Sequence, residues 1–425
     1  MARPIRTRRR PGWRIFSRLG GIGRKRALSL ACISALAVFI AANAGLSAFA
    51  NAVRAQNPAL IASLTDDPLA PLLAVERQIG ASPRRILGND VETLIRESLR
   101  REAINTAALR TFALRAEATR DRQAAVTFAR LAERSSRRDL VTQLVLIELA
   151  VQANSPELAL RHYDKALRTS GEARSILFPV LSSAIASDVI RRAFVPYVQR
   201  RAYWIPDFVQ HSMRSGEAGP RETAKLLILA GAGNQEELMR ASAPLLIEAL
   251  VDRGEVSLAQ RLFLQMPGTN PRFLQDTGFT SGTTNAAYGL LAWTPVSNGS
   301  AGAAFDGPPD SSRRSARLFA SSGERGILLR RVVGLPPGHY YLSERRSRAA
   351  GDASSRAYWE MKCFINGRPQ SIWRGPSDRA IYNLSRAPGP VVPAGCTNQL
   401  LELNVAAGDG REGLEFVIEQ FSLAR

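Results

Sequence analysis

Only three cysteines stand in this chain of 425 residues, and their surroundings differ. Cys32 lies in an uncharged apolar run, whereas Cys363 lies in the stretch YWEMKCF. Strand alternation would place Cys363 on the same apolar face as Trp359. Cys396 precedes a second strand-like run, QLLELNV, at residues 399–405. Such a cysteine can be reactive, a metal ligand, half of a disulfide or a small core residue, and the choice depends on the compartment.

No recognisable catalytic or metal-binding motif accompanies these cysteines. The histidines His162, His211 and His339 have no partner at helical spacing, so a zinc hydrolase has no visible ligand set. The sequence also lacks a Walker loop, a G-x-G-x-x-G turn and a G-x-S-x-G elbow. Five glutamates fall on strand-like runs, and only their separation in space would reveal a glycosidase pair: Glu344, Glu360, Glu402, Glu415 and Glu419. We expect a non-catalytic protein without cofactor or metal, with a glycan-active enzyme as the alternative.

Aromatic residues of the C-terminal region give the clearest indication of a ligand. Exposed rings can stack on the flat C–H faces of sugars while neighbouring polar groups bond the hydroxyls. Four residues are our candidates for glycan stacking: Trp373, Tyr382, Tyr340 and Trp293. We expect Trp373 and Tyr382 to be more exposed than Trp359. Core packing is the alternative role for each of these rings, because tryptophan and tyrosine also fill small β-sheet cores.

The formal net charge of +20 would suit a nucleic-acid-binding protein if it were spread along a binding face. However, residues 1–26 contain ten of the basic groups and no acid. The remaining excess is scattered, and neither zinc-finger spacing nor an RNP-like aromatic string accompanies it. We therefore expect no nucleic acid among the partners.

An uncharged, largely apolar run follows the basic tail, at residues 27–53. This run is long enough to cross a bilayer as one helix. The positive charges before it, with only Arg54 directly after it, predict a cytoplasmic N-terminus and a tail that can contact anionic lipid headgroups. The remaining chain would then lie in the periplasm, held by a signal anchor in a bacterial inner membrane. Cleavage near Ala50, after the A-x-A stretch 48–50, would instead release a periplasmic or secreted protein.

Both topologies export the two cysteines that lie outside the apolar run. The exported environment is oxidising, and the number of exported cysteines is even. The sequence therefore predicts a Cys363–Cys396 disulfide, with Cys32 as a small membrane-buried residue.

The middle of the chain has the periodicity of α-helices. Prolines interrupt residues 54–89, which we interpret as a linker, and helical periodicity begins near Asp90 and extends to residue 266. Small and aromatic residues recur at a spacing of 34 residues, with a fainter later copy: Ala125, Ala129 and Ala132; Ala159, Tyr163 and Ala166; Ala193, Tyr197 and Arg200; Ala259, Phe263 and Met266.

This pattern resembles the tetratricopeptide repeat, whose second helix carries a small residue, an aromatic four positions on and a small residue three beyond that. Gln143, Ile147 and Arg200 depart from the family pattern. The resemblance implies stacked helix pairs that bind a protein partner through an extended surface. An irregular helical bundle is the alternative.

The residue composition and the apolar periodicity of the sequence change at PGTNP, residues 267–271. Apolar alternation at period two then predicts strands at 326–333, 339–345, 358–365, 399–405 and 414–424. Residues 297–314 are expected to form a long exposed loop. The strands and turns predict an antiparallel β-sandwich, jelly-roll-like, that loosely resembles galactose-binding-like domains and carbohydrate-binding modules.

Together these patterns predict a multidomain α plus β protein. Its expected parts are a basic cytoplasmic tail (1–26), a transmembrane helix or signal anchor (27–53), a linker (54–89), an α-helical repeat domain (90–267) and a β-sandwich domain (272–425). We expect a membrane-anchored scaffold of the bacterial envelope, whose repeats bind a partner protein and whose sandwich binds a glycan or a protein. The resemblances suggest surface-polysaccharide assembly or export as its setting. The alternatives are a glycan-active enzyme with its site in the sandwich and a purely structural envelope protein.

Overall fold

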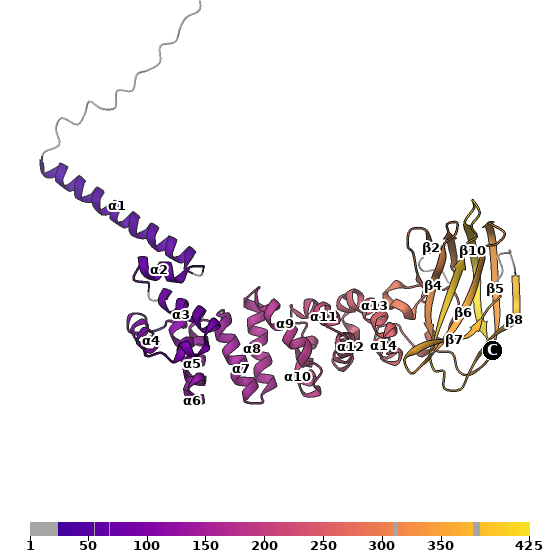
Figure 1. The fold of residues 1–425 in the computed structure, drawn as a ribbon, viewed down its shortest axis with the longest axis horizontal. Helices are drawn as coiled ribbons and strands as arrows, with labels where there is room; N and C mark the ends of the chain where they lie inside the picture. Colours follow the sequence, from indigo (N-terminus) through magenta and orange to yellow (C-terminus); the bar gives the residue numbers. More distant parts are fainter. Residues whose placement is uncertain (1–23, 55, 68, 309–312, 377–382) are drawn as a thin grey trace, which may run out of the picture. The chain divides into compact units, whose positions relative to one another are not determined.

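The computed structural model describes residues 24–54, 56–67, 69–308, 313–376 and 383–425. Its helices precede its strands along the chain (Figure 1). This order confirms the predicted fold class, a helical region followed by antiparallel sheets. The chain divides into two compact units, Met1–Val145 and Leu146–Arg425. The domain limits that we expected from the sequence stay predictions.

Helix α1 spans Arg24–Val53, and its part Ile33–Val53 is long and apolar enough to cross a membrane. Apolar side chains along this part are exposed; Phe39, for example, is 66% exposed. Such a surface is unfavourable in water, and in a membrane it would face lipid. The polar side chain of Asn43 donates a hydrogen bond to the carbonyl of Phe39 (2.9 Å), which satisfies one amide N–H within the helix itself.

The segment that we expected to be a linker is largely helical. It contains α2 (Pro58–Leu64), α3 (Ala70–Ala81) and the 3₁₀ helix η1 (Pro83–Leu87). Pro58 and Pro71 occupy the first turn of α2 and α3. The N–H that proline lacks has no partner within a helix at this position, so proline is well tolerated there. Prolines that resembled helix breakers in the sequence therefore mark helix starts.

The remaining helices of the first unit pack through small side chains. They are α4 (Asn89–Arg101), α5 (Thr106–Ala118) and α6 (Arg122–Ser135), and α7 (Leu140–Gln152) follows across the boundary between the units. The alanines Ala125, Ala129 and Ala132 of α6 are wholly buried. Phe112 and Phe128 stack between α5 and α6 with ring centroids 4.2 Å apart. Alanines let the two helices approach closely, and the aromatic pair fills the space beside them.

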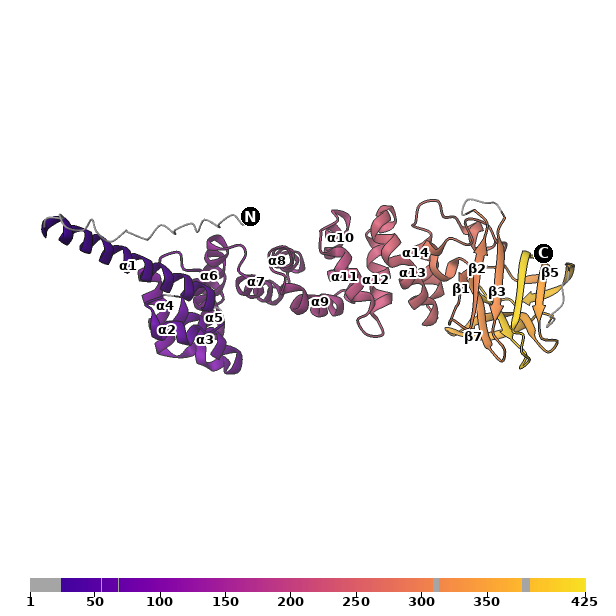
Figure 2. The ribbon, with the colours of Figure 1, turned by 90° about the horizontal axis from the view of Figure 1, so that it is seen from above.

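The second unit continues with helices that lie in two layers. They are α8 (Pro156–Thr169), α9 (Ala173–Ala184), α10 (Asp188–Gln199), α11 (Ile205–Met213), α12 (Gly219–Leu229), η2 (Ala232–Asn234), α13 (Glu236–Asp252) and α14 (Val256–Phe263). Contacts join α8, α10, α12 and α14 in one layer and α9, α11 and α13 in the other (Figures 1 and 2). The aromatic positions of the 34-residue pattern, Tyr163, Tyr197 and Phe263, are buried in this array.

Two antiparallel sheets of five strands each follow in the second unit. One has the order β1 (Thr294–Pro295), β4 (Arg325–Val333), β9 (Gln399–Ala406), β6 (Arg356–Ile365), β7 (Arg368–Arg374). The other has the order β2 (Ala301–Asp306), β3 (Ser315–Ala320), β10 (Leu414–Ala424), β5 (Gly338–Gly351), β8 (Asn383–Val392). One continuous core fills the space between them, with Trp293, Trp359 and Phe421 at its centre.

Two local expectations for the sandwich are corrected by the structure. Part of the segment 297–314 is strand β2, which pairs with β3 from Ala301 opposite Ala320 onward. Its sequence AGAAFD lacks large alternating side chains, so its pairing through the main chain left little signal in the sequence. The same alternation that places Trp359 and Cys363 inward predicts an inward Ile365, but Ile365 is exposed because β6 ends there in a turn.

The segment between the last helix and the first strand is fixed by a buried arginine. Arg331 on β4 is fully buried, and its guanidinium donates hydrogen bonds to the carbonyls of Phe273 (2.8 Å), Asp276 (2.5 Å) and Leu291 (3.0 Å). These carbonyls belong to η3 (Pro271–Leu274), to η4 (Ala286–Leu291) and to the chain between them. Burial lowers the pKa of Arg331 to about 9, so the group remains charged at neutral pH. Main-chain carbonyls thus compensate the buried charge.

Replacing Arg331 with methionine should strongly destabilise the second unit. Three carbonyls, of which that of Leu291 is buried, would lose their donor, and the loss at a buried carbonyl alone costs about 1–3 kcal/mol. We expect the free energy of unfolding to fall by at least about 3 kcal/mol in urea titrations followed by tryptophan fluorescence. Arg317→Ala is the matched control, because this exposed partner of Asp306 should contribute less than about 1 kcal/mol. Equal stability of the two variants would contradict this role.

Candidate functional site

Cys363 on β6 and Cys396 in the loop before β9 lie at disulfide distance. Their Sγ atoms are 2.11 Å apart and their Cα atoms 5.8 Å apart. Both residues are buried in the core of the sandwich. The pairing that the sequence predicts therefore joins two positions that the fold brings together, and its place in the core is that of a structural disulfide.

The candidate glycan-stacking residues occupy different environments. Trp293 is only 1% exposed, and its indole N–H donates to the carbonyls of Thr277 and Gly278, both at 3.2 Å. Tyr340 is also buried, with its hydroxyl donating to the Pro336 carbonyl. The stacking prediction is wrong for these two residues, because neither ring has a face free for a sugar.

The other two candidates for glycan stacking are Trp373 and Tyr382. Trp373 is half-buried on the edge strand β7 and packs against the core of the sandwich. Tyr382 lies outside the described residues. Of the three candidate rings that the structure describes, only Trp373 is therefore open in part to a ligand.

Two of the glutamates considered for glycoside chemistry lie on neighbouring strands. Glu360 on β6 pairs in register with Glu402 on β9. The Lys362 Nζ lies between them, 2.6 Å from Glu402 Oε2 and 3.5 Å from Glu360 Oε2. Burial lowers the pKa of Lys362, but the hydrogen bond and charge of Glu402 outweigh this effect and raise it overall. Arg330 and Arg374 flank the pair. This arrangement is an ion-pair ladder on the face of the sheet that points away from the sandwich core, and both glutamates are buried in it.

An apolar groove opens among the helices of the second unit. Its volume is about 390 Å³, and its lining comes from the end of α7, from α8, from α9 and from α10. Three valines along it are more than half exposed: Val151 (52%), Val180 (51%) and Val189 (54%). Tyr163 also lines the groove, and burial, with the charge of Glu148, raises the pKa of its phenol. The groove can accept apolar side chains of another molecule, and we call it the apolar groove.

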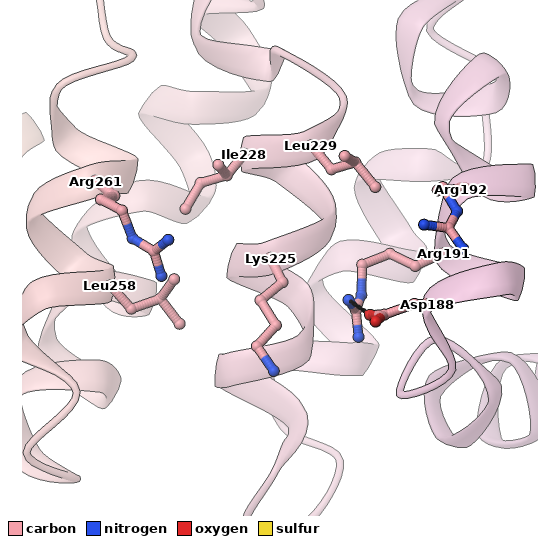
Figure 3. A pocket seen from close by; sticks show the side chains of 8 residues that line it. All are labelled: Asp188, Arg191, Arg192, Lys225, Ile228, Leu229, Leu258 and Arg261. Atoms are coloured by element: carbon pink, nitrogen blue, oxygen red, sulfur yellow. Dashed lines mark hydrogen bonds and ion pairs between the residues drawn. The ribbon is translucent and has the colours of Figure 1, made fainter.

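A second groove, of about 330 Å³, lies across α10, α12 and α14. Figure 3 shows its cations projecting from these three helices around a floor of aliphatic side chains. We call it the basic groove, and its lining is Asp188, Arg191, Arg192, Lys225, Ile228, Leu229, Leu258 and Arg261. The layer in which α10, α12 and α14 are neighbours brings together residues that are far apart in sequence.

The cations of the basic groove are not equivalent. Arg191 is buried and bound by Asp188 and Glu222, so it belongs to the packing of the helices. Lys225 is partly exposed and lies 2.9 Å from Glu222. Arg192 and Arg261 are exposed and have no ion-pair partner in the described part of the chain. The groove therefore carries unpaired positive charge at both of its ends.

Neither groove was found from the sequence, although a signal for the second one existed. Arg192, Lys225 and Arg261 are 33 and 36 residues apart, close to the 34-residue spacing of the repeat pattern. A search for recurring surface charge at that spacing would have aligned them. The apolar groove had a weaker signal, in the form of valines at positions outside the apolar face of their helices.

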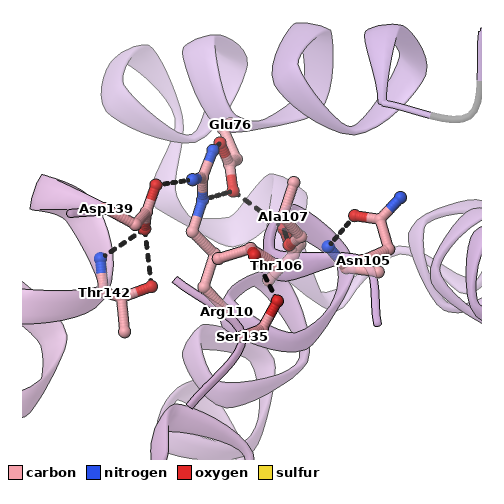
Figure 4. A network of polar contacts seen from close by, with 10 residues as sticks. Glu76, Asn105, Thr106, Ala107, Arg110, Ser135, Asp139 and Thr142 are labelled. Atoms are coloured by element: carbon pink, nitrogen blue, oxygen red, sulfur yellow. Dashed lines mark hydrogen bonds and ion pairs between the residues drawn. The ribbon is translucent and has the colours of Figure 1, made fainter. Parts of the chain in front are cut away.

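A third polar cluster, in the first unit, is structural. Arg110 on α5 is buried and donates hydrogen bonds to Glu76 and Asp139, as Figure 4 shows. Asp139 also accepts from the main-chain N–H of Thr142 (2.8 Å) and so caps the start of α7. Burial lowers the pKa of Arg110, but hydrogen bonds and charges from Glu76 and Asp139 raise it overall. These charges satisfy one another and hold three helices together.

Comparisons with known proteins give little further information. No protein-family model matches the chain, and no curated protein matches it. Among solved structures, the chain is similar to TmCBM61 in complex with β-1,4-galactotriose. That similarity covers 32% of this chain and 90% of the other, at 15% identity and a TM-score of 0.21. A similarity of this degree leaves the ligand of this chain open.

The cysteine pair should resist thiol reagents in the mature protein. In a Cys32→Ala background, denatured but unreduced protein from membranes should show no reactive thiol, and reduction should release two. Closing a loop of 33 residues contributes about 3–4 kcal/mol on the chain-entropy model, so Cys363→Ala/Cys396→Ala should lose about that much stability. Two labelled thiols before reduction would refute the pairing.

Glu76→Gln should loosen the first unit, because it leaves the buried Arg110 with one carboxylate instead of two. Breaking a buried ion pair costs about 3–5 kcal/mol, so hydrogen exchange in α3 and α5 should become faster by roughly 100-fold or more. Glu97→Gln is the control, because Glu97 forms an exposed pair with Arg101 on α4. Exchange in the second unit serves as an internal reference. Unchanged protection of α5 would show that the network does not stabilise it.

Proposed function

We propose that this protein is a membrane-anchored binding protein that holds a partner protein on its helical array. The observation that carries the proposal is the apolar groove, with three valines more than half exposed around one hollow. Exposed apolar surface gathered in one place is typical of interaction sites. Scattered surface valines would need no such explanation.

The organisation of the helices supports the same role. Successive pairs stack in two layers, and the aromatic residues of the 34-residue pattern lie inside with its small residues, except the partly buried Ala193. This is what the resemblance to tetratricopeptide repeats leads us to expect. Stacked helix pairs form extended surfaces that suit long protein ligands.

The N-terminal region gives the proposed place of action. We infer that α1 stays in a bacterial inner membrane as a signal anchor, with the basic tail in the cytoplasm and the chain after residue 54 in the periplasm. The support is the apolar length of Ile33–Val53 and the positive charge that precedes it. The cysteine pair at disulfide distance fits an oxidising compartment.

The proposal also gives a role to the β-sandwich. We propose that the sandwich binds a glycan or a second protein without catalysis, in an assembly for surface-polysaccharide synthesis or export. Trp373 and Tyr382 are the remaining candidates for contact with sugar. In support of a non-catalytic role, Glu360 and Glu402 share Lys362 and act as ion-pair partners.

A photo-crosslinking amino acid at Val180 tests the proposed function in native membranes. The full-length protein should give a discrete adduct from this position, which lies in the apolar groove. The matched control is Leu245 on α13, which is 55% exposed and lies outside the groove, and which should give none. Val189→Glu should reduce the adduct at least about fivefold without lowering the melting temperature, because surface substitutions rarely change stability by more than about 0.5 kcal/mol. Equal labelling from both positions, or from neither, would contradict the proposal.

A further inference from the structure

We propose that the basic groove binds an acidic segment of the partner protein, with carboxylates set among apolar side chains. This inference rests on the proposed function and names the chemistry of the partner. It assigns a role to residues of α10, α12 and α14 that the packing of the helices does not explain.

The first argument is the contrast between neighbouring arginines on α10. Arg191 has Asp188 and Glu222 as partners, whereas Arg192 is exposed and has none in the described part of the chain. Arg261 on α14 is likewise exposed and has no ion-pair partner among the described residues. A guanidinium presents a planar set of donors that matches a carboxylate. The two ends of the groove are therefore ready to receive anions.

The second argument is the position of Lys225 between these ends (Figure 3). Its ammonium group has three donors, and one of them is used by the Glu222 carboxylate at 2.9 Å. Packed helices lie about 8–10 Å apart, and a polyproline II chain advances about 3.1 Å per residue with about three residues per turn. A segment crossing α10, α12 and α14 in this conformation would thus bring every third side chain, all on one face, to a cation.

The third argument is the floor of the groove, which separates a peptide from other polyanions. Ile228, Leu229 and Leu258 line it between the cations. Nucleic acids and acidic polysaccharides carry no aliphatic side chains to cover such a floor. A peptide with leucine or valine between its acidic residues satisfies both the charges and the apolar surface.

The fourth argument is that the two grooves meet on one helix. Val189 and Ile190 of α10 line the apolar groove, while Asp188, Arg191 and Arg192 line the basic groove. One segment of a partner can therefore run from one groove into the other. Its apolar end would occupy the first and its acidic end the second.

Fluorescence anisotropy with synthetic peptides on the purified full-length protein in detergent tests this inference. The probe is a 12-residue peptide with glutamate at every third position and leucine or valine between, and its match has glutamine in place of glutamate. We expect the acidic peptide to bind at least about tenfold more tightly, and to weaken with added salt. Arg192→Gln/Arg261→Gln should remove this preference. The charge-matched control is Arg214→Gln/Arg240→Gln, which changes exposed arginines outside the groove and should retain it.

Three results would overturn the inference. They are equal binding of both peptides, unchanged binding by the groove variant, and equally tight binding of a polyglutamate without apolar residues, which would show a simple polyanion site. The crosslink from Val180 keeps the two proposals apart. A retained crosslink with failed peptide binding would leave the proposed function standing, whereas a lost crosslink would contradict that function directly.

Discussion

Arg331 is charged, fully buried and bonded to main-chain carbonyls of Phe273, Asp276 and Leu291. A buried cation is costly, so each of these carbonyls must stay where the guanidinium can reach it. The segment that leads from the helices into the sandwich therefore has little freedom. The grooves and the sheets belong to one compact unit, and this segment joins its helices to its strands.

The fold was predictable wherever one pattern dominated a segment. Strands β6, β9 and β10 largely alternate apolar and polar side chains, β4 is rich in aliphatic residues, and α1 contains a long apolar run. Strand β2 was missed because alanine and glycine carry little periodic signal and its pairing depends on β3. Helices α2 and α3 were missed because the effect of Pro58 and Pro71 depends on whether a proline stands at the start or in the middle of a helix.

The candidate sites were harder to predict, since they depend on contacts between distant segments. Nothing local distinguishes Trp293, buried against Trp359 and Phe421, from an exposed ring. The grooves form from side chains on separate helices, and their alignment depends on the turns between the helices. The cysteine pair was accessible because few cysteines exist and the compartment limits their chemistry. That prediction was possible because cysteines are rare in this chain, whereas Arg192 and Arg261 could not be singled out among its many arginines.

The loop that carries Cys396 has a second role that follows from its neighbours. Asn398 lies two residues beyond the cysteine and accepts a hydrogen bond from Gln260 of α14 at 2.6 Å. Gln399, the next residue, donates to the carbonyl of Cys396 and of Leu335. A reducing environment would leave this loop held by hydrogen bonds alone. Oxidation of the two thiols would then also fix the position of the residue that Gln260 contacts, so the docking of the last helix on the sandwich would depend on the redox state of this pair.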